Sequence, residues 1–266
     1  MSRIQEALKK ARQGKDARPS KKNAFAPLSH IEYTKTKVVD SKKANLVANN
    51  VISVLVNDDR AQLFRTLRTK IAQKMRQQGW VTLGITSPNI GEGKSTIASN
   101  LAVAMAMEVN QSVLLVDMDL QSPSLAKTFD IEPEKGFQDY LKGGTDIEDV
   151  LVNPGKERLV IVPSTGRATN SSELLSSPAA AQFFDDAKRR YKNRFIVCDL
   201  PSVLPTDDVM ATLNNIDCTL LVVEDGKNSA VDIKRTLQIL QGTEVIGTVL
   251  NKTHSEFRTT ETALGN

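Results

Sequence analysis

Short apolar, β-branched runs alternate along this chain with segments in which hydrophobic residues recur every three or four positions. The runs have the length and composition of strands. They cover Val81–Thr86, Ser112–Val116, Leu159–Pro163, Phe195–Cys198, Cys218–Val223 and Val245–Leu250. The segments with helical spacing are Arg60–Gln78, the stretch that opens at Lys94, Ala179–Tyr191, Thr206–Asn214 and Ser229–Gln241. Near-continuous apolar strands between amphipathic helices are typical of a parallel sheet covered on both faces. The pattern therefore predicts an α/β fold with a doubly wound, mostly parallel sheet.

The first sixty residues do not follow this alternation. Residues 1–43 carry twelve lysines and arginines against four acids, so 23 basic and 27 acidic residues of the totals of 35 and 31 are left for the rest. Ser2 is placed to cap a short amphipathic helix over Arg3–Gln13, and Gly14–Lys43 has the Lys, Ser and Pro content of a linker. Val51–Val56 is predicted to be an edge strand. We therefore expect residues 1–60 to form a basic N-terminal arm, either solvated or bound to anionic lipid, nucleic acid or an acidic partner.

Length and composition limit the class of protein. With 266 residues the chain can bury a substantial core in one large domain, which we place at residues 61–254, before a tail at 255–266. Cys198 and Cys218 lie inside apolar runs and are expected to be buried thiols in a reducing compartment. No charge-free apolar segment reaches the roughly 18 residues that span a bilayer, and no apolar core follows the N-terminal basic residues. These features predict a cytoplasmic protein.

The first predicted core strand leads into a phosphate-binding motif, SPNIGEGKST at residues 87–96. A strand, a glycine-containing loop and Gly-Lys-Ser-Thr at a helix N-terminus cradle nucleotide phosphates, because backbone N–H groups and the helix dipole favour an anion there. We expect Lys94 to reach the β- and γ-phosphates and the Ser95 hydroxyl to bind Mg²⁺. The usual spacing is G-x-x-x-x-G-K-[ST], and Pro88 occupies its first glycine position. The residues expected to bind the nucleotide are Asn89, Ile90, Gly91, Glu92, Gly93, Lys94, Ser95 and Thr96, with Asn251 after the last predicted strand.

Three aspartates follow predicted strands: Asp117 and Asp119 end one strand, and Asp199 ends another. The carboxyl ends of parallel strands meet at one edge of the sheet, where ligands bind. A phosphate-bound Mg²⁺ needs only one or two carboxylates, so we expect Asp117 and Asp199 to hold it with Ser95, with Asp199 as a Walker B aspartate. Asp117 or Asp119 is also a candidate base for an incoming hydroxyl, and with Lys94 the two form the predicted catalytic set. The alternative for any one strand-end aspartate is a helix cap.

The motifs ITSPNIGEGKST, VLLVDMDLQSP and FIVCDLPSVLPTDD, in this order and spacing, resemble the three nucleotide motifs of bacterial tyrosine kinases. These are the cytoplasmic ATPase-like kinases of capsular and exopolysaccharide export. The segment QLFRTLRTKI at residues 62–71 is similar to the helix by which they assemble into rings. The opening SRIQEAL at residues 2–8 resembles members found beside exosortase-type gene clusters. The resemblance covers roughly Ala61 to Lys252.

The resemblance implies a P-loop NTPase fold of the MinD-like (SIMIBI) class, with ATP and Mg²⁺ as ligands. It implies a homo-oligomer with Gln62, Arg65 and Arg68 at its contacts, although two arginines at this spacing also occur on solvated helix faces. It also implies a membrane-spanning chain-length-determinant partner whose cytoplasmic tail completes the site, and so a place at the inner face of the membrane.

The sequence departs from the family pattern in three places. Gln62 stands where the ring helix usually has Glu, and Gln121 stands where the second motif usually has Arg. The family's tail carries tyrosines that are autophosphorylated, whereas residues 253–266 contain no tyrosine. The tyrosines of this chain are Tyr33, Tyr140 and Tyr191. The resemblance therefore favours an ATP-binding switch over a kinase that phosphorylates itself.

The leading hypothesis is a Mg·ATP-dependent, tyrosine-kinase-like protein that regulates exopolysaccharide or capsule polymerisation and export. One alternative is a partitioning or cell-division ATPase that dimerises on DNA or membrane. Those relatives carry a lysine early in the phosphate loop, and residues 87–90 contain none, so nucleic acid is not an expected partner. Another alternative is a nucleotide-binding regulatory module without kinase activity, which would combine tight binding with low turnover.

Overall fold

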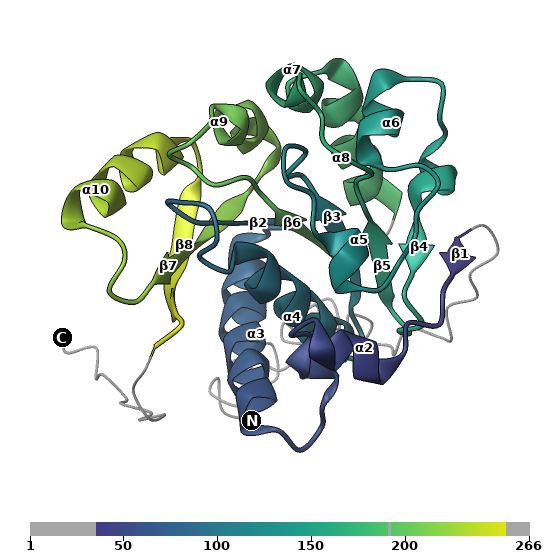
Figure 1. Cartoon of the computed structure of the whole chain (residues 1–266), viewed down its shortest axis with the longest axis horizontal. Helices are drawn as coiled ribbons and strands as arrows, with labels where there is room; N and C mark the ends of the chain where they lie inside the picture. The colour runs from purple at the N-terminus through teal and green to yellow at the C-terminus, as the bar shows by residue number, and fades with distance from the viewer. Residues whose placement is uncertain (1–35, 191–192, 254–266) are drawn as a thin grey trace, which may run out of the picture.

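An eight-stranded sheet runs through the part of the chain that the computed structural model describes, residues 36–190 and 193–253 (Figure 1). The strand order is β1-β4-β5-β3-β6-β2-β7-β8, and neighbours are parallel except β4 and β5. The strands are β1 (Lys37–Val38), β2 (Thr82–Thr86), β3 (Ser112–Asp117), β4 (Val152–Asn153), β5 (Leu159–Val162), β6 (Arg194–Asp199), β7 (Cys218–Glu224) and β8 (Glu244–Asn251). The predicted doubly wound, mostly parallel sheet is confirmed.

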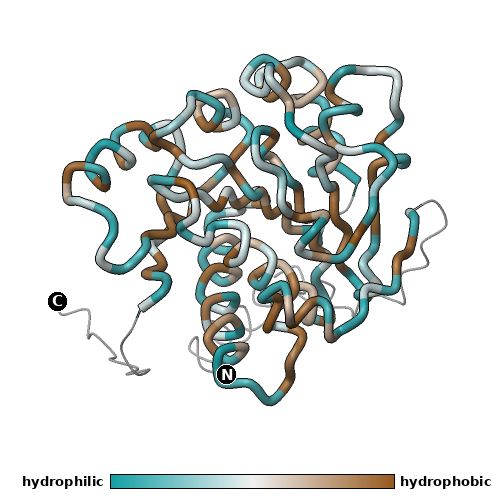
Figure 2. The backbone as a smooth tube through the Cα atoms, in the orientation of Figure 1, coloured by the Kyte–Doolittle hydropathy of each residue, from teal (hydrophilic) through white to brown (hydrophobic). Residues whose placement is uncertain are grey.

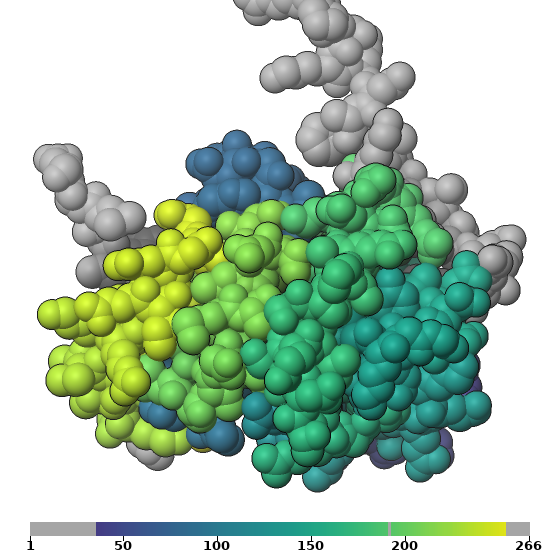
Figure 3. All heavy atoms as spheres, turned by 90° about the horizontal axis from the view of Figure 1, so that it is seen from above, coloured from purple at the N-terminus to yellow at the C-terminus, as the bar shows by residue number. Residues whose placement is uncertain are grey.

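Helices cover both faces of this sheet. They are α2 (Lys43–Ala48), α3 (Asp59–Gln78), α4 (Lys94–Ala106), α5 (Leu125–Thr128), α6 (Phe137–Lys142), α7 (Ser171–Leu175), α8 (Pro178–Arg190), α9 (Asp208–Thr212) and α10 (Ala230–Ile239). Short 3-10 turns occur at η1 (Ile52–Val54), η2 (Ile147–Val150), η3 (Leu213–Asn215) and η4 (Leu240–Gly242). Seen from above, the yellow C-terminal segments, the green segments around α9 and the teal segments around α6 follow one another across the molecule (Figure 3).

Two hydrophobic cores lie on opposite faces of the sheet because side chains alternate along each strand. In β3, Val113 and Leu115 belong to the core that α3 and α4 cover, whereas Leu114 and Val116 belong to the core under α6, α7 and α8. Hydrophobic residues accordingly colour the central strands brown in Figure 2. Full burial of one such side chain stabilises the fold by about 1.5–3 kcal/mol, so the strands that carry the site have rigid support.

Helices α3 and α4 have the ends and faces that their sequences predict. Asp58 accepts a hydrogen bond from the Arg60 amide at the start of α3, and Gly79 in the left-handed conformation ends it. Most residues of helix α4 are apolar or small on every side of the helix. Leu101 and Met105 are fully buried between α3 and the sheet. This packing fixes the start of α4, which carries the phosphate-binding motif.

The structure corrects the expectations for the segment before α3. The linker expected at Gly14–Lys43 contains, in its described part, strand β1, and the Ser41 hydroxyl donates to the buried Phe129 carbonyl. The edge strand expected at Val51–Val56 is instead the 3-10 turn η1. Its geometry comes from the Asn100 side chain, which accepts from the Ser53 amide at 2.8 Å.

The sequence pattern did not predict several short elements, among them β1, β4, α2, α5 and α7. The predicted helix Arg3–Gln13 lies outside the described residues. No helix among the described residues combines the length and the apolar character needed to cross a bilayer.

Candidate functional site

The phosphate-binding motif forms the loop between β2 and α4. Gly91 and Gly93 adopt left-handed backbone conformations, with φ of 82° and 96°, which glycine enters without steric penalty. Gly93 is the N-cap of α4, and Lys94 is its first residue. A Cβ at Gly93 would overlap the Asn251 side-chain amide, so the position requires glycine for two independent reasons. The loop and the N-terminus of α4 thus have the arrangement that the predicted anion site requires.

The loop is fixed to the segment that follows β6. The Ser87 carbonyl accepts from the Val203 amide at 2.9 Å, and the Pro88 carbonyl accepts from the Leu204 amide at 3.0 Å. The Ser87 and Ser202 hydroxyls lie 3.3 Å apart. Pro88 contributes a carbonyl, which proline retains, and can therefore occupy the first glycine position of the usual spacing.

Lys94 is buried among three side-chain oxygens. Its Nζ lies 2.8 Å from Asp119 Oδ2, 3.4 Å from Asp199 Oδ1 and 3.2 Å from Ser95 Oγ. Burial alone would lower the pKa of Lys94, but the carboxylates, first Asp199 and then Asp119, outweigh it and raise the pKa above its ordinary value. The ammonium therefore stays charged. It neutralises carboxylates in this structure, and phosphate oxygens would compete for it.

Asp117 and Asp199 occupy paired positions on β3 and β6, and both are fully buried. Asp117 Oδ2 accepts from the amides of Ser124 (3.0 Å) and Leu125 (2.9 Å), so this carboxylate does cap α5. Asp117 Oδ1 and Asp199 Oδ2 have no partner among the described residues. Burial, followed by the charge of Asp199, raises the pKa of Asp117 to about 8, and burial also raises the pKa of Asp199.

These orphaned oxygens fit a magnesium ion that is shared with a nucleotide. Lys94 Nζ lies 3.2 Å from Ser95 Oγ and 3.4 Å from Asp199 Oδ1, so the hydroxyl and the carboxylate expected to hold the metal border the same ammonium group. Mg²⁺ prefers oxygen ligands and is completed by phosphates and water. No group of three or more His, Cys, Asp and Glu that could hold a metal occurs in the described part of the chain. A magnesium ion here would therefore depend on nucleotide phosphates for its remaining ligands.

The other predicted nucleotide contacts line or support the loop. Glu92 is fully buried, and its Oε1 accepts from Asn228 Nδ2 at 2.6 Å. Asn251 Nδ2 donates to the Glu92 carbonyl at 2.8 Å, so Asn251 reaches the loop. Ile90 is exposed at the loop's tip, and Asn89 and Thr96 are half-buried. The structure thus brings Asn251 to the predicted motif from the far end of the sequence.

A cavity of about 240 Å³ adjoins Asp119 and is also lined by Gln121 and Arg167. Gln121 Nε2 donates to Ser171 Oγ at 3.1 Å and to Asp208 Oδ2 at 3.0 Å, which joins the Asp119 loop to α7 and α9. A hydroxyl group that entered this cavity would meet Asp119. Sequence reasoning did not find Arg167 or Ser171, since neither belongs to a motif, and only the topology brings them here.

The predicted oligomer contacts lie on α3 but differ in environment. Arg65 Nε donates to Gln62 Oε1 at 2.7 Å, and both side chains are on the outside. Arg68 turns toward its own chain, where it donates to the Ala104 carbonyl at 3.1 Å and pairs with Glu108 at 3.4 Å. Gln62 and Arg65 are therefore open to a neighbour, while Arg68 belongs to an internal network.

The sequence matches a family model, the CobQ/CobB/MinD/ParA nucleotide binding domain, over residues 83–265. It is 29% identical over 203 residues to the tyrosine-protein kinase YwqD of Bacillus subtilis (strain 168), covering 74% of this chain and 84% of YwqD. It is also 29% identical over 198 residues to the succinoglycan biosynthesis transport protein ExoP of Rhizobium meliloti (strain 1021). That match covers 73% of this chain but only 25% of ExoP.

Solved structures share the fold. The chimerical protein CapA2B2 matches with a TM-score of 0.71 at 25% identity, over 82% of this chain and 93% of that one. The kinase domain of the Escherichia coli tyrosine kinase ETK matches with a TM-score of 0.70 at 25% identity, over 78% and 83%. MinD from Pyrococcus horikoshii OT3, complexed with Mg-ADP, matches in fold with a TM-score of 0.53 at 24% identity, over 64% and 69%.

The matched range includes the phosphate loop, Lys94 and all three strand-end aspartates. Bacterial tyrosine kinases are homologues of this chain, and the chain belongs to the CobQ/CobB/MinD/ParA nucleotide binding domain family.

Proposed function

We propose that this chain is a Mg·ATP-dependent, tyrosine-kinase-like P-loop protein that regulates exopolysaccharide or capsule polymerisation and export. The observation that carries this proposal is the buried position of Lys94 between Asp119 and Asp199 at the start of α4. The kinase part draws support from the relatives that are tyrosine kinases by name. The polysaccharide part draws support from ExoP, a succinoglycan biosynthesis transport protein by name.

Each residue of the cluster has a distinct task in this proposal. The loop amides bind the phosphates, and Lys94 exchanges its carboxylate partners for phosphate oxygens. Ser95, Asp117 and Asp199 would hold magnesium, which when bound neutralises phosphate charge and polarises the transferred group. Asp119, at the edge of the cavity that Gln121 lines, takes the proton of the attacking hydroxyl or water. The cavity beside Asp119 is where that nucleophile would bind.

A membrane-spanning chain-length-determinant protein is the proposed partner. The match covers only 25% of ExoP, a transport protein by name, and the proposal pairs this chain with a membrane-spanning protein. We place this chain at the cytoplasmic face of the membrane through that partner, as a homo-oligomer whose outer contacts include Gln62 and Arg65. Arg68 would not contact the neighbour directly, and its ion pair with Glu108 would hold α3 in place behind that surface.

The test is to incubate the purified chain with Mg·ATP, with and without the cytoplasmic tail of the partner, and to measure phosphate release and phosphopeptides. Slow hydrolysis that the tail accelerates is expected, with Lys94→Met as the inactive control. Hydrolysis that DNA stimulates and the tail does not would instead favour a partitioning ATPase. Tight nucleotide binding with no turnover under any condition would favour a regulatory module.

A further inference from the structure

Three consecutive carbonyls of the phosphate loop are held by side chains from the β7 and β8 side of the sheet. Each acceptor is a loop carbonyl, and each donor is an amine or amide. The pairs are Lys227 Nζ with the Ile90 carbonyl at 3.3 Å, Lys252 Nζ with the Gly91 carbonyl at 2.7 Å, and Asn251 Nδ2 with the Glu92 carbonyl at 2.8 Å.

Glu224, the last residue of β7, joins the two lysines. Its Oε2 accepts from Lys227 at 3.2 Å and from Lys252 at 3.1 Å. The hydrogen bond from Lys252 is the main cause of a lowered pKa at Glu224, so the carboxylate is ionised at neutral pH. Asn228 accepts from the Glu224 amide at 3.1 Å and donates to the Glu92 carboxylate at 2.6 Å. Lys227, Lys252 and Asn228, which all reach the loop, are therefore joined through hydrogen bonds to Glu224.

The arrangement has a direct consequence for the amides of the loop. In a planar trans peptide the carbonyl and the following N–H point in opposite directions. Carbonyls held toward β7 and β8 therefore direct the N–H groups of Gly91, Glu92 and Gly93 the other way. Successive amides turned to one side form the concave anion site that phosphate requires.

We propose that Glu224, Lys227 and Lys252 form a clamp that holds the phosphate loop in its binding conformation. They are positioning residues, which act through the loop carbonyls. Two left-handed glycines make this loop easy to rearrange, and fixing it before the ligand arrives removes an ordering penalty from binding. The proposal rests on nucleotide binding at this loop and is independent of kinase activity.

The test measures the affinity of the full chain for a fluorescent ADP analogue. Lys252→Met and Glu224→Gln are each expected to weaken binding about fivefold, from the loss of one partly exposed charged hydrogen bond. Lys252→Arg keeps a donor and is expected to restore most of the affinity. The matched control is Lys234→Met on α10, an exposed lysine with no bond to the described residues, which is expected to bind like the parent chain.

Two further measurements separate positioning from general stability. The melting temperature without nucleotide should change little, because the clamp touches a loop and no core side chain. The double variant Lys252→Met with Glu224→Gln should lose less than the sum of the single losses, because Glu224 acts in part through Lys252. Parent-like ADP affinity in both single variants, while Lys94→Met binds poorly, would overturn the clamp and leave the nucleotide site intact. Parent-like affinity in Lys94→Met as well would overturn the nucleotide site itself.

Discussion

Asp117 and Asp199 stand at directly paired positions of β3 and β6, with both carboxylates fully buried. Burial raises the pKa of both, and the charge of Asp199 adds to the effect at Asp117, whose pKa is about 8. Lys94 supplies one positive charge beside these groups and Asp119. The protein therefore sets one ammonium group beside three aspartates, and a divalent cation would supply further positive charge. We infer that part of the fold's stability is given up at this position for ligand binding.

The first prediction concerns pH. The unfolded chain releases the Asp117 proton near its ordinary pKa of 3.8, and the folded chain releases it near 8. Between these values the folded state binds more protons, so the free energy of unfolding should fall as pH rises from about 4 to about 8. Acids with lowered pKa, such as Asp217, titrate below this window. Thermal melting of the nucleotide-free chain across the window measures the effect, and Asp117→Asn should flatten it. An unchanged slope in that variant would contradict the assignment.

The second prediction separates the metal from the scaffold. Asp117→Asn and Asp199→Asn should reduce Mg²⁺-dependent ATP hydrolysis far more than they reduce stability, because each replaces a carboxylate ligand of the metal with an amide of the same size. Hydrolysis as a function of Mg²⁺ concentration, with melting curves of the same preparations, tests this. Should both variants hydrolyse ATP at the parent rate and melt earlier, the aspartates act only as caps.

The third prediction concerns Lys94. Lys94→Met should lower ATP affinity at least tenfold, about 1.4 kcal/mol, because it removes the charge that neutralises phosphate. It should also lower stability at neutral pH, since Asp119 and Asp199 lose their buried partner. Titration of a fluorescent ATP analogue into the folded variant measures the first effect. Unchanged affinity would contradict the site.

Gly91 and Gly93 offer a matched pair for the fourth prediction. Both have positive φ, so Ala at either position carries a backbone penalty of about 1 kcal/mol. A Cβ at Gly91 meets open space, whereas at Gly93 it overlaps Asn251 Nδ2. Gly93→Ala should therefore lose more stability and more nucleotide affinity than Gly91→Ala. Adding Asn251→Ala to Gly93→Ala should recover the excess stability. Equal losses in the two single variants would show that the overlap is relieved by a shift of Asn251.

The sequence predicted the elements that are long enough to show a hydrophobic period within their own residues. The six main strands, α3 and α4 each carry enough residues for a period to be recognised. Strands β1 and β4 have two residues each and no detectable pattern. Val51–Val56 is apolar enough for a strand, but Asn100, 47 residues away, binds the Ser53 amide and stabilises a turn. A contact of that separation leaves no trace in the local sequence.

The same distinction applies to the site. Lys94, Ser95 and the strand-end aspartates were predicted because motif and strand pattern place them without knowledge of the fold. Lys227 and Lys252 meet the loop 137 and 161 residues away from their acceptors, and only the pairing of β7 with β2 and β8 brings them there. Surface lysines after a strand are common, so nothing in the sequence distinguishes these two.

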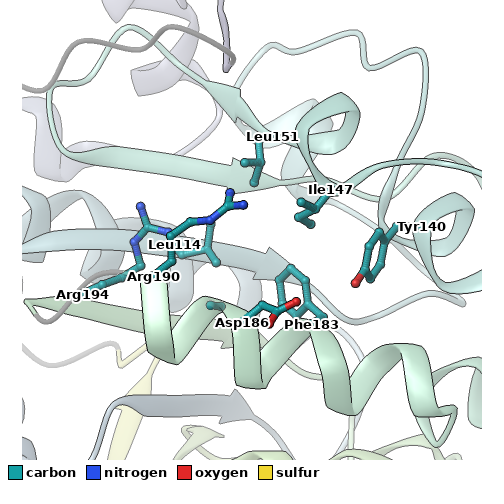
Figure 4. Close-up of a pocket in the computed structure, with 9 residues that line it drawn as sticks. Leu114, Tyr140, Ile147, Leu151, Phe183, Asp186, Arg190 and Arg194 are labelled. Atoms are coloured by element: carbon teal, nitrogen blue, oxygen red, sulfur yellow. The ribbon is translucent and has the colours of Figure 1, made fainter.

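The last prediction concerns the phosphate acceptor. Tyr140 on α6 packs against Phe137 and Phe183, with ring centroids 6.4 and 5.9 Å away. It borders a cavity of about 50 Å³, where Asp186 also lies (Figure 4). Burial, and then the charge of Asp186, raises the pKa of Tyr140. The charge of Asp186, which lines the same cavity, would repel an incoming phosphate.

We therefore expect little phosphate on Tyr140 when the isolated chain is incubated with Mg·ATP, and Tyr140→Phe should hydrolyse ATP at the parent rate. Phosphopeptide mapping decides this, and it also reports on Tyr33 and Tyr191, which lie outside the described residues. Heavy modification of Tyr140 would contradict the expectation, because α6 would have to leave Phe183 to present the ring. Phosphate that is found on none of these tyrosines passes to water or to another protein, and the ratio of free phosphate to phosphopeptide measures which.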